Sequence, residues 1–374
     1  SIDAANYNTG VGVDVFAALT TGDHNVAVGF SAGLANTTGT NNTFIGSLSG
    51  DANTTGNNNV SVGKSALSAN TTGSSETAVG KSALGANTTG AQNTAVGESC
   101  LATNTTGAYN TAVGFTALFA NTEGHSNVAV GNVALDANTT GDYNVAIGSY
   151  ALSAATTADK NVAVGPGTGQ LITTGANNTA IGADALDATT TGAENIAVGS
   201  GALGANTTAN DNVAVGGAAL GANTTGADNV AIGRVALNAN TTASNNVAIG
   251  RNALLANTTG PLNVAVGSGA LQTQTTSEYN TAVGYRAGYL ITDGLQNTYV
   301  GGQAGYASTT GDYNVGVGVN ALASQTTASN NTTCLSIYCI KRNNNDAKKF
   351  IVTEKRIAQT ERQIERSLRD IVEI

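Results

Sequence analysis

The stretch NVAVGNVALDANTTGDY at 127–143 decides the fold, because the next seventeen residues, NVAIGSYALSAATTADK at 144–160, repeat it almost position by position. The same spacing runs from Asn8 to Asn331 without insertion or deletion, which gives 19 complete repeats and the start of a twentieth. With the leading Asn counted as position 0, position 4 is always Gly, position 3 is always Val or Ile, and position 12 is always Thr. Such regular spacing requires one geometric unit per repeat, stacked on copies of itself.

Two short strands and two turns are expected in each unit. Large β-branched residues alternate with small ones over 26–29, and a second alternation covers 66–72, as in half-buried strands. Gly at position 4, and in most repeats at position 14, fits corners that need unusual backbone angles. We therefore predict an all-β fold, a parallel β-solenoid or β-roll of about 19 coils of 17 residues over 8–333, after a lead-in at 1–7.

The repeat also predicts which side chains face inward. Stacked coils place like residues over like at about 4.8 Å, so the rod would be roughly 90 Å long. We expect Val and Ile at positions 1 and 3 and Leu at position 8 to form the apolar interior, with a ladder of Asn amides at position 0. Thr at position 12 would point inward and bond a turn carbonyl. Ala at positions 2, 7 and 10 would then leave a small, flat outer face for lateral packing, most simply in a homotrimer.

The pattern ends after residue 333. Residues 334–349 read as a transition or cap, and 350–374 as a short C-terminal α-helix. Phe350, Ile357, Ile364 and Ile371 lie seven apart, which is typical of a coiled coil, here a trimeric one that would close the rod and set the chain register. The alternative is a single amphipathic helix that caps the last coil.

The repeat motif resembles a known family. Asn25–Gly29, Asn93–Gly97 and Asn144–Gly148 are similar to the head repeats of trimeric autotransporter adhesins, and the longer stretch Asn110–Thr122 also resembles repeats of bacteriophage tail fibres. The resemblance covers about 8–333. It implies a left-handed parallel β-roll assembled as a trimer, and it transfers no residue-level binding site.

The composition excludes several classes of function. Charged residues make up 10% of the chain, against about a quarter in ordinary soluble domains. Residues 1–340 hold 6 basic and 18 acidic residues, and such an acidic rod argues against nucleic-acid partners, which need a positive stripe. No run of 18 apolar residues occurs, so membrane insertion is not expected.

No residue pattern predicts catalysis, a metal or a cofactor. Cys334 and Cys339 could pair at the rod end, whereas Cys100 stands alone and no C-x-x-C motif occurs. His24 and His125 are single and far apart, and we expect both to be solvated turn residues. Acidic residues scatter over positions 9, 15 and 16 rather than forming a catalytic pair. We therefore expect no enzyme and no cofactor.

Two polar features are candidate contact sites. Asn at position 11 and Thr at position 13 would form an outward ladder on one flat face, suited to glycans or to ice; its first members are Asn36, Thr38, Asn53, Thr55, Asn70, Thr72, Asn87 and Thr89. Exposed aromatic residues at position 16 could stack on sugars or pack over a neighbouring corner; they are Tyr7, Tyr109, Tyr143, Tyr279 and Tyr313.

Together these features predict a structural protein. We expect the shaft of an extracellular fibre, cell-surface appendage or virion tail fibre, which associates with itself and makes weak multivalent contacts with cell-surface glycans. The alternative is an ice-binding or glycan-binding solenoid that uses the Asn/Thr ladder.

Overall fold

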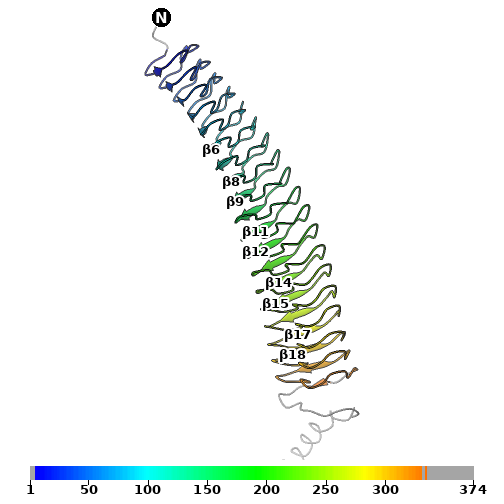
Figure 1. Cartoon of the computed structure of the whole chain (residues 1–374). Helices are drawn as coiled ribbons and strands as arrows, with labels where there is room; N and C mark the ends of the chain where they lie inside the picture. Colours follow the sequence, from blue (N-terminus) through cyan, green and yellow to red (C-terminus); the bar gives the residue numbers. More distant parts are fainter. Residues whose placement is uncertain (1–4, 331–332, 335–374) are drawn as a thin grey trace, which may run out of the picture.

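The computed structural model describes residues 5–330 and 333–334, which form a gently curved rod with one coil per repeat (Figure 1). Each coil contributes one short strand at positions 1–3, and the strands join in a single parallel sheet. The strands are β1 (Thr9–Val11), β2 (Val26–Val28), β3 (Thr43–Ile45), β4 (Val60–Val62), β5 (Thr77–Val79), β6 (Thr94–Val96), β7 (Thr111–Val113), β8 (Val128–Val130), β9 (Val145–Ile147), β10 (Val162–Val164), β11 (Thr179–Ile181), β12 (Ile196–Val198), β13 (Val213–Val215), β14 (Val230–Ile232), β15 (Val247–Ile249), β16 (Val264–Val266), β17 (Thr281–Val283), β18 (Thr298–Val300), β19 (Val315–Val317) and β20 (Thr333–Cys334). The predicted parallel β-solenoid with coils of 17 residues is confirmed.

The sheet keeps the register of the repeat until its last step. Val128 pairs with Val145 and Ala129 with Ala146, each 17 residues on, and the same offset holds from β1 to β19. In the last pair, Val315 lies opposite Thr333, which is an offset of 18. The sequence spacing of 17 holds to Asn331, but the pairing of the last two strands is shifted by one residue relative to it.

The second predicted strand does not form. Positions 5–11 are a series of turns, because the residues at positions 6 and 8 adopt left-handed backbone angles, as in Thr116 (φ 49°) and Leu118 (φ 53°). A left-handed residue bends the chain and cannot continue a strand. Even so, this segment bonds to the next coil, since the Leu118 backbone N–H donates to the Ala134 carbonyl at 2.9 Å. A coil of 17 residues thus turns back on itself without losing its hydrogen bonds to the next coil.

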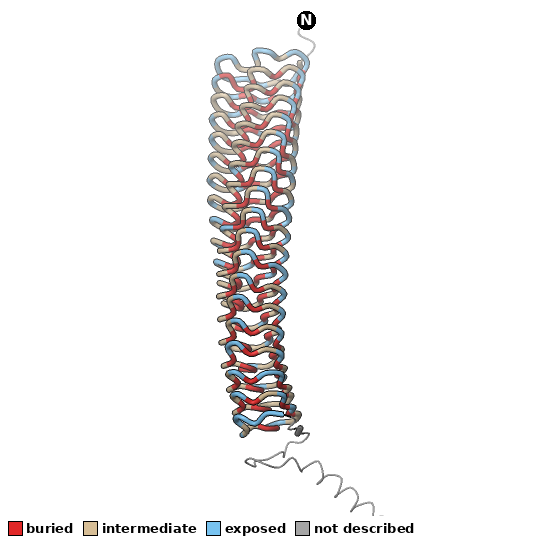
Figure 2. Tube along the Cα trace, turned by 90° about the vertical axis from the view of Figure 1, so that its right-hand side faces the viewer, coloured by how far each residue is buried: buried red, intermediate tan, exposed pale blue. Residues whose placement is uncertain are grey.

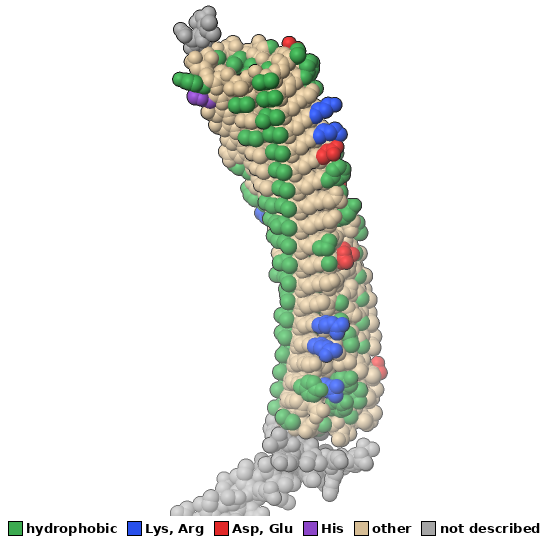
Figure 3. Space-filling model, turned by 60° about the vertical axis from the view of Figure 1, so that its left-hand side comes forward, with side chains coloured by type: hydrophobic (Ala, Val, Ile, Leu, Met, Phe, Trp, Pro, Cys, Tyr) green, Lys and Arg blue, Asp and Glu red, His purple; other side chains and the backbone are tan. Residues whose placement is uncertain are grey.

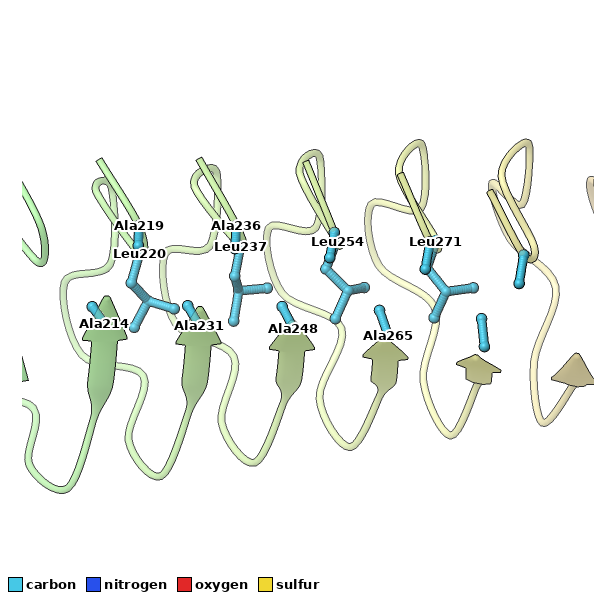
Figure 4. Close-up of a cluster of buried hydrophobic side chains, with 14 of the residues drawn as sticks. Ala214, Ala219, Leu220, Ala231, Ala236, Leu237, Ala248, Leu254, Ala265 and Leu271 are labelled. Carbon is cyan, nitrogen blue, oxygen red and sulfur yellow. The ribbon is translucent and has the colours of Figure 1, made fainter. Parts of the chain in front are cut away.

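Alanine and leucine, rather than valine, line the interior. In the coil that contains β13, Ala214, Ala219 and Leu220 are fully buried, and this arrangement recurs along the rod (Figures 2 and 4). Leu at position 8 points at the strands, as predicted. The expectation that Val and Ile at positions 1 and 3 point inward is wrong, as is the expectation that Ala at positions 2 and 7 faces outward. Where Leu occupies position 8, it fills the space opposite the strand and leaves room on the inner side of the strand only for a small side chain.

In two coils an aromatic residue replaces Ala at position 2, and position 8 compensates. Phe44 and Tyr299 occupy position 2 and are buried, and Gly replaces Leu at position 8 of the same coil, at Gly50 and Gly305. A Cβ atom on Gly305 would lie 2.5 Å from the Tyr299 ring. The aromatic ring therefore fills the volume that Leu occupies in other coils, as close packing requires.

Two buried ladders of asparagine hold the coils together. At position 0, the Asn42 backbone N–H donates to Asn25 Oδ1 at 2.9 Å, which confirms the predicted Asn ladder. At position 11, Asn53 Nδ2 donates to Asn36 Oδ1 at 2.9 Å. Both ladders meet at position 14, where the Gly39 carbonyl accepts from Asn25 Nδ2 at 2.9 Å and from Asn36 Nδ2 at 3.1 Å. These amides satisfy most of the polar groups inside the coils, which would otherwise be costly to bury. Within the described ladders, the only buried amide atoms with no partner are Asn138 Oδ1, Asn246 Nδ2 and Asn257 Oδ1.

Several predicted features lie outside the described residues. These are most of the transition at 334–349, the helix or coiled coil at 350–374, Cys339, and the first four residues of the lead-in. The described part of the chain contains no helix long and apolar enough to cross a bilayer.

Candidate interaction surfaces

The outward side of the sheet is a continuous apolar face. Position 3 is Val or Ile in all 19 coils and position 1 is Val, Ile or Thr, and both point away from the interior. Val28 is 38% exposed, Ile147 40% and Ile249 37%. Figure 3 shows the result as an unbroken hydrophobic stripe along the rod. We call these two columns of side chains the Val/Ile face.

The size of the Val/Ile face is unusual for the surface of a free chain. With coils about 4.8 Å apart, it is about 90 Å long and, including its methyl groups, roughly 10 Å wide. An apolar strip of about 900 Å² exceeds the largest patch on most monomers, about 300–600 Å². It is comparable to the roughly 800 Å² that each partner buries in a stable protein interface.

Of the predicted Asn/Thr face, only the Thr side chains are exposed. Thr38, Thr55, Thr72 and Thr89 are exposed, as expected, and belong to a column of Thr at position 13 that is interrupted only by Glu123 and Asp293. Their predicted Asn neighbours are buried, with no exposed surface: Asn36, Asn53, Asn70 and Asn87. The expectation that position 11 points outward is therefore wrong, because those amides form the inner ladder.

Threonine at position 12 has a structural role. Thr37 Oγ1 donates to the Thr54 carbonyl of the next coil at 3.0 Å, and Thr88 Oγ1 donates to the Thr105 carbonyl in the same way. These side chains are half-buried rather than fully inward, and the carbonyl they bond belongs to the neighbouring coil. The hydroxyls left free along this edge are those of position 13.

The tyrosines at position 16 lie at exposed corners. Tyr109 and Tyr143 are each 60% exposed, Tyr279 50% and Tyr313 52%, and all four have left-handed backbone angles. At the N-terminal end, the Tyr7 ring instead stacks on His24, with centroids 4.9 Å apart. Four of the five rings thus project from turns in which neither ring nor hydroxyl serves the core.

Most acidic side chains at position 15 accept a backbone N–H of the preceding coil. At position 15, Asp142 Oδ1 accepts the backbone N–H of His125 at 2.6 Å, and Asp312 Oδ1 accepts that of Leu295 at 2.8 Å. His125 makes the same kind of contact through Nδ1, which accepts from Ala108 at 2.9 Å. Both His125 and His24 are exposed, as expected. The acidic residues at this position therefore lengthen the hydrogen-bonded edge of the coil.

The buried titratable groups are isolated from one another. Burial raises the pKa of the Cys100 thiol to about 12, which leaves it an unreactive packing residue. Burial also raises the pKa of Glu76, in the Asn ladder, to about 8. Within residues 5–330, no three His, Cys, Asp or Glu side chains lie close enough together to hold a metal ion.

One cluster was not anticipated from the sequence. In the coils of β17 and β18, the Arg286 guanidinium lies 5.2 Å from the Tyr285 ring centre and 5.1 Å from that of Tyr289. Tyr289 in turn stacks on Tyr306, with centroids 5.3 Å apart and planes 5° apart. The signal was present in the sequence, since Ala-Gly-Tyr occurs at both 287–289 and 304–306 in place of the usual Ala-Leu. We call these four side chains the Tyr/Arg cluster.

No protein-family model matches this chain, and no curated protein is similar enough to count as a relative. The surfaces themselves must therefore carry the functional argument.

Proposed function

We propose that this chain is the repeat shaft of an extracellular fibre, either a cell-surface appendage or a virion tail fibre, and that its role is structural rather than catalytic. The observation that carries the proposal is the Val/Ile face, which runs the length of the solenoid and is exposed on a single chain. Burying such a face is the main source of free energy for association.

The proposed partner is the chain itself, as a homotrimer. A closed symmetric assembly can turn the Val/Ile face of each chain toward a common axis, so that no copy leaves its apolar strip in water. The area of the face meets what a stable interface needs. The resemblance to the heads of trimeric autotransporter adhesins and to tail-fibre repeats supports the same arrangement and the extracellular setting.

The proposed mechanism is rigidity with multivalent display. Parallel hydrogen bonds and the position-0 ladder tie each coil to the next, and the position-11 ladder adds further bonds where Asn occupies that position. Bending therefore requires many bonds to distort together. Exposed Thr side chains recur in nearly every coil along one edge, and exposed Tyr side chains project from the corners of a few coils. Three chains would multiply weak contacts of these side chains with cell-surface glycans.

Sedimentation of the full chain tests the structural proposal. We expect a single elongated species with three times the mass of the chain, and cross-linking that ends at the trimer. A strictly monomeric rod at all concentrations would contradict the proposal, because the Val/Ile face would then remain in water.

Ice binding by the exposed Thr column is the second candidate function. The column is regular, but it is a single file, because the Asn side chains beside it are buried. Thermal hysteresis measurements decide this alternative, and no activity at high protein concentration would remove it.

A further inference from the structure

We propose that the Tyr/Arg cluster is a binding site for an acidic saccharide, that is, a pyranose ring carrying a carboxylate. The inference deepens the adhesive part of the proposed function, and it rests on contacts within one chain. Its first basis is geometry: the Arg286 guanidinium lies near the rings of both Tyr285 and Tyr289, and the Tyr306 ring stacks on Tyr289 from the next coil.

The cluster departs from the repeat, and glycines occur beside it in the coils before and after. Gly269, in the preceding coil, contacts the cluster: a Cβ atom there would be 3.4 Å from Arg286 Cγ and 3.5 Å from Tyr289 Cδ2. At Gly302, which follows Tyr285 in the same column, a Cβ atom would meet nothing within 4 Å. The Tyr285 side chain is 53% exposed, and the surface beside it at Gly302 carries no side chain.

Charge indicates an anionic ligand. Arg286 is not paired with a carboxylate, because the one ion pair among the described residues joins Lys81 and Glu98. Arg234 and Arg251 are exposed on the same flank, at position 5 of the coils of β14 and β15. From 229 to 310 the described chain has no acidic residue at positions 5–9, although the rod as a whole is acidic. Within the described residues, this flank of the acidic rod therefore carries an excess of positive charge.

The chemistry of the cluster fits a carboxylated sugar. Tyr rings offer an apolar face for the C–H side of a pyranose and a hydroxyl for its polar groups. A guanidinium that lies close to aromatic rings and has no carboxylate partner can bond the carboxylate of a ligand with two parallel hydrogen bonds. A nucleic acid, with one charge about every 1.7 Å, would be repelled by the acidic rod. A glycan with one carboxylate per sugar or fewer meets much less repulsion.

Binding to an array of uronic-acid and sialic-acid oligosaccharides, each beside its neutral analogue, tests the proposal on the full chain. We expect acidic members to bind and neutral analogues to bind at least about tenfold more weakly, which is the loss of one charge-assisted contact. Arg286→Gln should lower the affinity by a similar factor, and Tyr289→Ala should do so as well. Gln already occupies the equivalent position of the next coil, at Gln303, so Arg286→Gln should fold normally.

Lys64→Gln is the matched control, because Lys64 is an exposed base in the same column as Arg251 but belongs to neither an ion pair nor an aromatic contact in the described structure. It should leave binding unchanged. The proposal is overturned if no carboxylated saccharide binds, if neutral analogues bind equally well, or if Lys64→Gln costs as much affinity as Arg286→Gln. Sedimentation of the same samples separates this result from the proposed fibre role, since the trimer can be present without any saccharide binding.

Discussion

Glu76 is the one residue that replaces Asn in the ladder at position 0, and its place shows what that ladder requires. Its backbone N–H donates to Asn59 Oδ1 at 2.9 Å, and its carboxylate oxygens accept from the Asn93 N–H at 3.2 Å and from Asn93 Nδ2 at 3.3 Å. It is fully buried. An ionised Glu can accept but cannot donate, so it lacks the N–H with which Asn bonds the position-14 carbonyl of its coil. The protonated carboxyl group has one O–H, which can donate in place of the missing Asn N–H.

We expect Glu76 to make stability depend on pH. Burial raises its pKa from 4.5 to about 8 in the folded chain. Between these values the folded state binds more protons than the unfolded state, so the contribution is complete below pH 4.5 and is lost as the pH rises toward 8. The loss amounts to at most about 1.4 kcal/mol per pH unit. Denaturant unfolding and hydrogen exchange in the coils of β4–β6 at pH 5 and pH 8.5 measure it.

Glu76→Asn should abolish this part of the pH dependence and raise stability at pH 8.5. The control is Glu194→Gln, which removes an acid from an exposed turn and should leave the pH profile unchanged. If the wild-type chain and the Glu76→Asn variant lose stability equally between pH 5 and pH 8.5, the buried carboxyl is not the cause.

At the scale of the residue, the sequence predicts well which residues repeat, but it predicts poorly whether their side chains point inward or outward. The Asn ladder at position 0 followed from its spacing, but Asn36 and its equivalents were assigned to the surface. Alternation alone cannot say which side of a strand is buried. The pairing of Phe44 with Gly50, and of Tyr299 with Gly305, carried that information, because a large residue at position 2 with a small one at position 8 indicates that the two share a space.

At the scale of the coil, the invariant Gly at position 4 sets the path of the chain as it leaves the strand. Gly131, after β8, has φ 141°, a conformation that L-residues rarely adopt. A Cβ atom there would lie 2.5 Å from the Gly148 carbonyl oxygen of the next coil. Both the backbone angle and the stacking distance therefore require glycine, which explains the strict repetition of this residue.

Gly131→Ala should destabilise the rod by at least about 2 kcal/mol, because the strained angle alone costs about 1–3 kcal/mol and the clash adds to it. Gly217→Ala is the matched control, since a Cβ atom at Gly217 meets nothing within 4 Å and its φ is not in the left-handed range. The control should be neutral or slightly stabilising. Unfolding midpoints of the two variants give the comparison, and equal midpoints would show that position 4 tolerates a side chain.

The second segment of the coil shows where prediction from sequence stopped. Residues 66–72 alternate like a strand, yet Leu67 has φ 53° and the segment is a run of turns. Alternation reports that neighbouring side chains face opposite ways, and alternate right- and left-handed residues produce that pattern as well as a strand does. Leu in a left-handed conformation is costly in isolation, and here its complete burial against the strands offsets that cost.

At the scale of the whole molecule, the Val and Ile side chains of the strands face outward instead of inward. The larger apolar surface of the sheet therefore lies on the outside of the rod. Lateral association was expected from rows of small Ala side chains, and the surface available for it is instead the Val/Ile face, which offers far more apolar area. The thin coil explains both facts: its interior is filled by Ala and Leu, so the larger β-branched side chains can only point outward.

We therefore expect charges on the Val/Ile face to dissociate the assembly without unfolding the chain. Ile147 and Ile249 are 40% and 37% exposed and take no part in the buried core of their coils. The double variant Ile147→Asp with Ile249→Asp should shift the sedimenting species to the mass of one chain, because carboxylates buried in an apolar interface are strongly unfavourable. Its circular dichroism should keep the β signal of the wild type.

The control places the same two charges on the exposed Thr column, as Thr140→Asp with Thr242→Asp, where Asp293 already occurs naturally. That variant should assemble as the wild type does, and equal dissociation of both variants would mean that net charge, rather than the Val/Ile face, governs association.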